Sequence, residues 1–442
     1  MISQPLRALG TLAAALAVHG IAGAQVSPQP STQATDVTIY GTLDLGLDRV
    51  SKDQGNVSGT AYSVVQGTVQ PNSVASPKTA STRLAPSLSA QSLIGIKGVE
   101  VIGGGYSGKF TLEGGLAADN GALTQDGRAW GRQAWVGLQT PAGEFRVGRQ
   151  VAPMMVGYYM TSLGRLGSTD VFAAGVTYNN LQVFLDNAVS YLIKQGPWFG
   201  MVSYSTNGGI AARTSAARAP VASDSTGQIV GGATAGQEDT SGRGRTTTAM
   251  LSHSDGGLVL SGTYNHNRLN TVIGLAGSSF VPLYRATAYD SWMLAAKYEW
   301  TEQGTALAAN LHEGKLAESG GDDPKTRTLA LSLRQTWGRY AVLATVARTA
   351  FTNFTRGKDT ALLLGAEASL SKRTHLYLGW GFVDDDRGRI VGSTLSPTAR
   401  LAGGPVTLLV PIGSLEVPLF SGAGMNMDAR TRIAAVGIRH SF

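Results

Sequence analysis

The sequence has 442 residues with a formal net charge of +7, and it contains no Cys. Without Cys the chain holds no disulfide and no thiolate-based catalytic or metal site. Its Lys and Arg residues are spread out, with no basic block and no interleaved run of aromatic residues, so nucleic-acid binding is not supported.

The composition favours one large sheet over a bundle of membrane-spanning helices. Gly occupies 58 positions and only 15% of residues are charged. Beyond the N-terminal segment there is no stretch of about 18 apolar residues, so no membrane-spanning helix is predicted. Apolar residues scattered singly still suit a transmembrane barrel, because each strand of such a barrel needs only every second residue to be apolar.

The N-terminal segment has the features of a secretory signal peptide. Arg7 is its only charge, a short apolar run covers residues 8–21, and small residues at 22–24 offer a cleavage site before Gln25. The run is too short and too interrupted for a membrane anchor. We therefore expect an exported protein with a signal peptide at 1–24, a short leader at 25–35 and one folded domain at 36–442.

The first predicted strand, residues 36–50, alternates between apolar and polar side chains. Ile39, Leu43 and Leu47 share one parity, and Tyr40 and Asp44 share the other. A period of two gives the strand one apolar and one polar face. In a soluble β-sandwich the apolar face would pack into the core. In an outer-membrane barrel it would face lipid, and the polar face would line the lumen. This strand alone leaves both interpretations open.

The connections between strands alternate between long loops and tight turns to the end of the chain. This places all long loops at one rim and all short turns at the other, which a Greek-key sandwich would not do. Counting gives about sixteen strands of roughly ten residues, an even number as in single-chain bacterial barrels. The predicted fold is therefore an all-β, transmembrane antiparallel β-barrel. Apart from the excursion described below, the long connections are 51–89, 120–127, 207–244, 269–286, 314–324, 353–358 and 384–425, and the short ones are 100–105, 140–143, 195–197, 254–257, 301–304, 338–339 and 371–373.

Aromatic residues near strand ends favour the barrel over the sandwich. Trp337 ends a strand next to a tight turn, and Trp300 does the same. Trp and Tyr at such positions suit the headgroup zone of a membrane. The alternative is that they are ordinary core aromatics.

One connection differs from the others and organises the rest. Residues 145–150 form a strand, the pattern then breaks for about thirty-five residues, and a strand returns at 186–191. An excursion of this length between neighbouring barrel strands can fold outward into solvent or inward into the lumen. We favour the inward path, in which this segment sets the width and charge of a pore.

Six short motifs run from the first predicted strand to the last, which is expected at 428–442. They are 37–44 (VTIYGTLD), 95–100 (GIKGVE), 110–115 (FTLEGG), 131–138 (GRQAWVGL), 147–150 (VGRQ) and 436–442 (VGIRHSF). Together these motifs resemble those of the general porins of β-proteobacteria. The resemblance implies a sixteen-stranded homotrimer in the bacterial outer membrane, in contact with lipid and lipopolysaccharide, whose third loop folds into the lumen. It also implies that the terminal Phe442 is read by the outer-membrane assembly machinery.

The resemblance further implies a constriction with arginines on the wall. Arg132 and Arg149 lie at motif positions that supply wall arginines, and Arg146 has the inward parity on its strand. Strand parity groups Arg132 and Arg149 with apolar neighbours, so either a local bulge turns them inward or this assignment is wrong. Two positions depart from the family pattern: Leu93 replaces a wall arginine, and Asp186 puts a negative group where the family has a positive one.

The inward segment, 151–180, is also unusual in carrying few charges. Its apolar and aromatic residues include Met154, Met155, Tyr158 and Tyr159, and its only charges are Arg165 and Asp170. We expect a weakly polarised constriction that has little or no anion preference and passes neutral or partly apolar solutes. The alternative is that the Met and Tyr residues only pack the loop against the wall.

No enzyme, cofactor or metal site is predicted. The six His residues are scattered without metal-ligand spacing. His253 follows Ser252 directly, so their side chains point to opposite faces of a strand and cannot cooperate. The predicted function is an outer-membrane porin for passive diffusion of small hydrophilic solutes and ions. The alternative is an exported β-rich adhesin or binding protein without a pore.

Overall fold

The structure is a computed structural model, and it describes residues 35–55, 60–65, 68–73, 77–125, 127–163, 183–208, 244–275, 281–319, 323, 325–352, 357–386 and 429–442. The expected signal peptide at 1–24 and all of the expected leader except Thr35 lie outside these residues. None of the helices among the described residues combines the length and the apolar content needed to cross a membrane.

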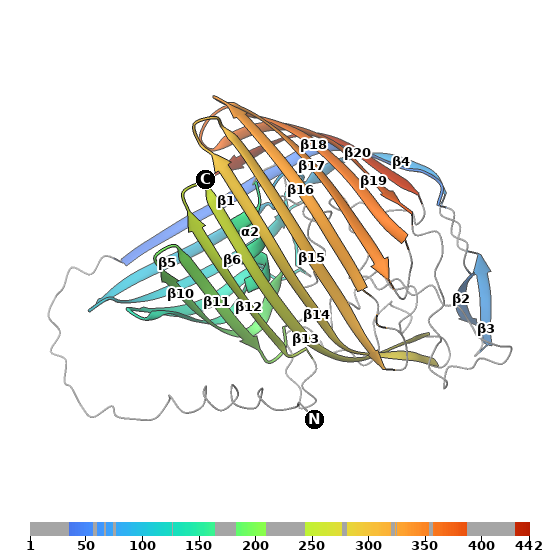
Figure 1. The fold of residues 1–442 in the computed structure, drawn as a ribbon, viewed down its shortest axis with the longest axis horizontal. Coiled ribbons are helices and arrows are strands. Elements are labelled where there is room, and N and C mark those ends of the chain that lie inside the picture. Colours follow the sequence, from blue (N-terminus) through green and yellow to red (C-terminus); the bar gives the residue numbers. More distant parts are fainter. Residues whose placement is uncertain are drawn as a thin grey trace. The chain divides into compact units, whose positions relative to one another are not determined.

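The described part of the chain is built almost wholly from antiparallel strands, which run side by side in Figure 1. One sheet joins eighteen of them. β4 and β5 pair with successive parts of β1, and the two-residue β7 pairs only with β6, so the wall has sixteen positions. The strands are β1 (Thr35–Lys52), β2 (Thr60–Val65), β3 (Thr68–Ser73), β4 (Thr79–Pro86), β5 (Leu93–Gly103), β6 (Tyr106–Ala117), β7 (Ala122–Leu123), β8 (Gln133–Thr140), β9 (Gly143–Val151), β10 (Phe184–Gln195), β11 (Trp198–Ser205), β12 (Thr246–Asp255), β13 (Leu258–Leu275), β14 (Val281–Trp300), β15 (Thr305–Ser319), β16 (Lys325–Trp337), β17 (Tyr340–Thr352), β18 (Gly357–Ser369), β19 (Thr374–Asp385) and β20 (Arg430–Ser441).

The first and last strands close the sheet into a barrel. β1 pairs with β20 from Thr42 opposite Ser441 to Lys52 opposite Thr431. The chain end takes part in this closure, because Gly41 and Phe442 exchange two backbone hydrogen bonds of 3.2 and 3.1 Å. Closure leaves no free sheet edge at the seam, as a barrel that crosses a membrane requires. The predicted sixteen-stranded antiparallel barrel is confirmed.

The two faces of the wall have opposite chemistry. The outer face exposes large apolar side chains, such as Ile39 at 64% and Leu294 at 58%. The inner face buries polar ones, including Asp44, Ser190 and Asn265. A soluble protein would bury its apolar face, so this pattern is that of a barrel whose outer surface meets lipid.

Three loops are shorter than the sequence predicted. The prediction of a loop at 269–286 is wrong, because β13 continues to Leu275 and β14 begins at Val281. β15 likewise extends into the loop expected at 314–324, and β4 lies within the one expected at 51–89. These segments pair with a neighbouring strand despite their irregular residue pattern, and register shifts after Arg268 and Ile273 absorb the irregularity between β13 and β14.

The only α-helix among the described residues, α2 (Pro153–Thr161), begins two residues after β9 ends. Pro153 occupies the first turn, where its missing N–H group costs no hydrogen bond. The helix has no side-chain cap, no acidic residue in its first turn and no basic residue in its last. Isolated helices this short are marginal in water, so α2 depends on packing against the wall.

Candidate functional site

The helix α2 lies against the inner face of β12, β13 and β14, and Figure 1 shows it behind the front strands of the wall. Met154, Met155 and Tyr158 pack on Met293 and Ala295, which belong to the inner face of β14. The Ser291 hydroxyl donates a 3.6 Å hydrogen bond to Met154 Sδ. The described first part of the long excursion therefore turns inward from the end of β9.

Beyond α2 the chain continues toward the rim that carries the short turns. Leu163 packs against Ala306 and Leu343, which lie close to the tight turns before β15 and β17. The Arg334 guanidinium donates a hydrogen bond to the Leu163 carbonyl. The predicted loop charges Arg165 and Asp170 lie outside the described residues.

Arg132 is buried in an ion pair on the inner side of the wall. It stands in a bend just before β8, so the strand alternation that would turn it outward does not yet apply. Arg132 Nε donates to Glu113 Oε1, and the Tyr40 hydroxyl donates a 2.9 Å bond to the other oxygen of Glu113. From α2, Tyr159 lies close enough to interact with both charges.

Arg149 is turned toward Asp186 by irregular backbone on two neighbouring strands. Gly148 has a φ of +126° and Asn187 one of +48°, and the register of β9 and β10 shifts between Leu185 and Ala188. Such a bulge re-aims the side chains around it. The Arg149 guanidinium donates to Asp186 Oδ1, and Arg128 donates to both oxygens of the same carboxylate at 3.0 Å.

The remaining predicted wall residues are Arg146 on β9 and Leu93 on β5. Arg146 donates to Glu144 and stacks on Trp135, with its guanidinium carbon 4.2 Å from the ring centre. Glu144 also accepts a 2.9 Å hydrogen bond from Lys109. Leu93 is half-buried between its strand partners and places no charge on the wall.

The sequence missed the carboxylates that compensate these arginines. Glu113 lies in one of the motifs and Glu144 lies next to a tight turn. Neither position indicates which cationic residue on a neighbouring strand it contacts. Arg128 lies in a loop before β8 and reaches Asp186, 58 positions away. A strand register between β6 and β8 would have suggested the pair of Glu113 and Arg132, because Glu113 is opposite Gln133.

The wall under α2 is neutral. Inner-face residues of β12 and β13 carry hydroxyl and amide groups instead of charges, namely Thr246, Thr248, Ser252, Ser261, Thr263, Asn265 and Asn267. The ion pairs of the predicted wall arginines lie on and beside β6 to β10, whereas the helix covers inner-face residues of β12 and β13 that carry no charge.

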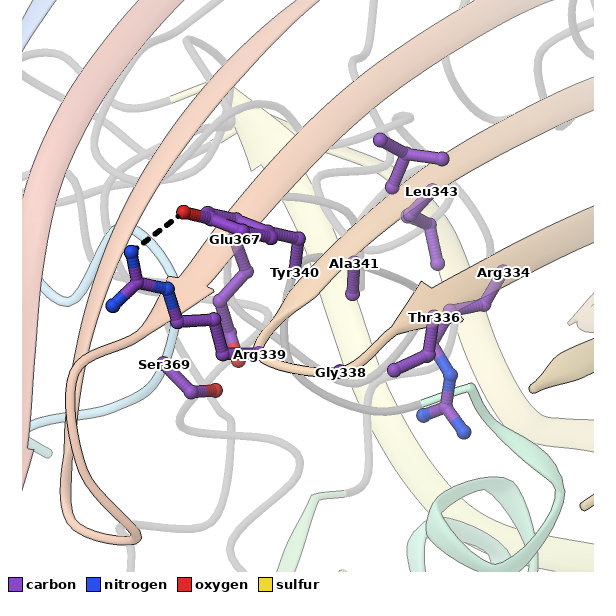
Figure 2. Close-up of a pocket in the computed structure, with 10 residues that line it drawn as sticks. Arg334, Thr336, Gly338, Arg339, Tyr340, Ala341, Leu343, Glu367 and Ser369 are labelled. Atoms are coloured by element: carbon purple, nitrogen blue, oxygen red, sulfur yellow. Dashed lines mark hydrogen bonds between the residues drawn. The ribbon is translucent and has the colours of Figure 1, made fainter.

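A cavity of about 280 Å³ lies near the short-turn rim, between β16, β17 and β18. Figure 2 shows Arg334 and Thr336 on one side of it and Glu367 and Ser369 on the other. Two of its three charged groups form ion pairs within the chain: Arg334 pairs with Glu299 at 2.8 Å, and Glu367 pairs with Arg439 at 2.7 Å. The third, Arg339, donates a 2.8 Å hydrogen bond to the Tyr340 hydroxyl. The cavity contains none of the sequence-predicted wall residues. Within the described residues no group of His, Asp and Glu side chains could hold a metal ion.

Comparison with known proteins gives one family throughout. A family model described as Gram-negative porin matches residues 11–388. An outer membrane porin protein of Bordetella pertussis is 31% identical over 184 residues, which is 41% of this chain and 42% of that protein. Outer membrane porin protein 32 of Delftia acidovorans is 25% identical over 436 residues, covering 97% of this chain and 98% of that one.

Solved structures agree on the fold. An anion-selective porin from Comamonas acidovorans superposes with a TM-score of 0.62 at 19% identity, over 92% of this chain and 100% of that one. The trimer form of OmpT from Vibrio cholerae superposes with a TM-score of 0.55 at 12% identity, again over 92% of this chain and 100% of that one.

Proposed function

This chain belongs to the Gram-negative porin family, and we propose that it lets small hydrophilic solutes and ions diffuse through a constriction with few uncompensated charges. It is an outer-membrane porin, and its family and fold are those of a channel. The finer proposal concerns where the channel narrows and which solutes it favours.

The narrowing is assigned to α2 together with the wall opposite it. α2 occupies space inside the barrel, and Tyr159 extends from it toward Arg132 and Glu113. Solutes would pass between this helix and the ion-paired wall of β6 to β10. Met154, Met155 and Tyr158 hold the helix on the neutral wall, while Tyr159 faces the charged one.

The low polarity of the constriction rests on one observation, the pairing of the wall arginines. Arg132 has Glu113, while Arg149 and Arg128 share the single carboxylate of Asp186, so that this second cluster keeps one uncompensated positive charge. A pore selects ions through side-chain charges at close range. An arginine with a carboxylate in contact presents a dipole to a passing ion, and the field of a dipole falls off faster than that of a lone charge. Leu93 and Asp186, the two departures from the family pattern, act in the same direction.

The relative from Comamonas acidovorans is described as anion-selective. At 19% identity that selectivity does not carry over to this chain. With Leu93 and Asp186 in place of basic groups, we expect anion preference to be weak, and neutral or partly apolar solutes to pass readily.

Reversal potentials in planar bilayers test this proposal. Wild type should show a small reversal potential across a KCl gradient at low salt, where screening is least. Leu93→Arg and Asp186→Arg should each shift the potential toward anion preference. A strong anion preference in wild type would refute the weakly charged constriction, and two silent substitutions would refute the assignment of the wall residues.

The assembly is proposed to be a homotrimer in contact with outer-membrane lipid and lipopolysaccharide. The solved trimer form of OmpT supports this state for the fold. We also propose that the assembly machinery reads Phe442, whose side chain remains exposed beside the seam. A band on unboiled SDS gels at three times the boiled mass would support the trimer, and a band at the monomer position under mild extraction would exclude it.

A further inference from the structure

All six methionines in the described part of the chain gather where α2 meets the wall. Three belong to the helix, at positions 154, 155 and 160, and three to the inner faces of β11, β12 and β14. They form two groups. In one group Met154 and Met155 contact Met293. In the other Met160 packs beside Met201 and Met250, next to Leu192 and Phe199.

This contact contains no ion pair to fix it. The helix has no charged residue, and its polar links to the wall include two serine hydroxyls donating to sulfur: Ser291 to Met154 and Ser252 to Met160, the latter at 3.4 Å. Methionine packs well in irregular gaps because its side chain is flexible and polarizable. The position of α2 therefore depends on thioether packing.

The six methionine residues differ in how far they are buried. Met154 and Met293 are fully buried, Met155 is 5% exposed, and Met201 and Met250 are each 4% exposed. Met160 is only partly buried and lies one residue before the end of the helix. A small polar oxidant that enters the lumen with water would meet Met160 first.

We propose that Met160 is an oxidation site through which hydrogen peroxide displaces α2 and changes the pore. This inference rests on the proposed function, because the channel delivers the oxidant. The thioether sulfur attacks one peroxide oxygen, an S–O bond forms and the O–O bond breaks. The proton on the transferred oxygen passes to the leaving hydroxide, which departs as water. Sulfur loses two electrons and the peroxide gains them. The product, a sulfoxide, is polar and chiral and disrupts methionine-rich contacts.

The direction of the change follows from the packing. The wall blocks one side of α2, so a helix that loses its fit to Leu192, Met201 and Met250 can move only toward the lumen. Single-channel conductance should fall and open-channel noise should rise. Methionine sulfoxide reductases, which restore the thioether, should return both to their starting values.

The test is a peroxide titration of purified channels in planar bilayers, with peptide mass spectrometry on the same samples. In wild type, conductance should fall in proportion to the Met160 sulfoxide fraction. In Met160→Leu, a swap of similar volume that cores tolerate well, the ratio of treated to untreated conductance should stay at one. Met250→Leu keeps the oxidation site and should still respond.

Three results would overturn the inference: full Met160 conversion with unchanged conductance, a rise in conductance, or an equal response in Met160→Leu. Each leaves the channel itself in place. If untreated protein forms no channels, the proposed function fails instead.

Discussion

Gly157 of α2 and Thr263 of β13 approach so closely that a side chain at Gly157 has no room. A Cβ atom there would come within 2.6 Å of both Thr263 Cγ2 and Ser261 Oγ. The helix backbone therefore lies directly on the side chains of the wall. This contact, together with the methionines, fixes how far α2 projects into the lumen.

Replacing Gly157 by Val should push α2 away from the wall. Because the clashing atoms belong to the short side chains of Ser261 and Thr263, which are held close to the sheet, the helix moves into the lumen and single-channel conductance falls below the wild-type value. Bilayer recordings of Gly157→Val measure this directly.

A compensating variant provides the control for that experiment. Ser261→Ala and Thr263→Ser remove the two atoms that a Cβ at position 157 would meet. Combined with Gly157→Ala, they should restore most of the conductance that Gly157→Ala alone loses. If Gly157→Val conducts like wild type, α2 does not limit the pore.

Removing the Asp186 carboxylate should increase anion preference. In Asp186→Asn, Arg128 and Arg149 lose their shared counter-charge. We expect the chloride-to-potassium permeability ratio to rise at least about twofold. The interaction energy of two unit charges 4 Å apart is ~4 kcal/mol at an effective dielectric constant of 20, and a twofold change in permeability needs only a small part of it.

The matched control for Asp186→Asn is Asp384→Asn, which breaks an exposed pair with Arg430 on the outer side of the wall. It should leave the reversal potential unchanged. Equal shifts in both variants would mean that general charge, and not the wall at Asp186, governs selectivity.

Asp44 should be a stability determinant at the seam of the barrel. Its carboxylate accepts backbone hydrogen bonds from Leu88, Ser89 and Ala90 at 2.9, 3.2 and 2.9 Å, and a 2.7 Å bond from the Tyr377 hydroxyl. Asp44→Ala leaves these buried donors without their acceptor. Each unsatisfied donor lowers the free energy of unfolding by roughly 1–3 kcal/mol. Unfolding in detergent should therefore begin at a clearly lower temperature or denaturant concentration.

An exposed ion pair gives the comparison for Asp44. Asp384→Ala removes a pair worth about 0–1 kcal/mol, so its unfolding curve should overlay that of wild type. Similar losses in the two variants would refute a special role for Asp44.

A charged substitution on the outer face should be destabilising at mid-height of the barrel and tolerated near the rim. Leu294→Arg places a cation on the exposed apolar face of β14 and should cost about 2–4 kcal/mol at the membrane midplane, with reduced assembly into the outer membrane. Thr247→Arg, on the same face at the long-loop end of β12, should assemble normally. Equal yields would contradict a lipid-facing surface.

The barrel was predictable because its signal is local. Alternation of Leu43 and Asp44 defines the two faces, and tight turns such as 338–339 mark the strand ends. The extension of β13 past Arg268 was not predictable, because register shifts rather than a period of two carry it.

For the proposed site, motif positions suggested residue types but gave no pairing. Arg132 and Arg149 were proposed from motif positions, yet strand parity pointed them outward. Their inward path depends on a bend before β8 and on positive φ angles at Gly148 and Asn187, which are properties of the folded backbone. Glu113 and Arg128 became visible as partners only through contacts between distant parts of the chain.

The most direct measurement adds purified protein to a planar lipid bilayer and records the current. If the apolar face of each strand meets lipid and the polar face encloses water, the current rises in discrete, uniform steps as channels insert. A protein that stays monodisperse without detergent and leaves the bilayer electrically tight would contradict this account.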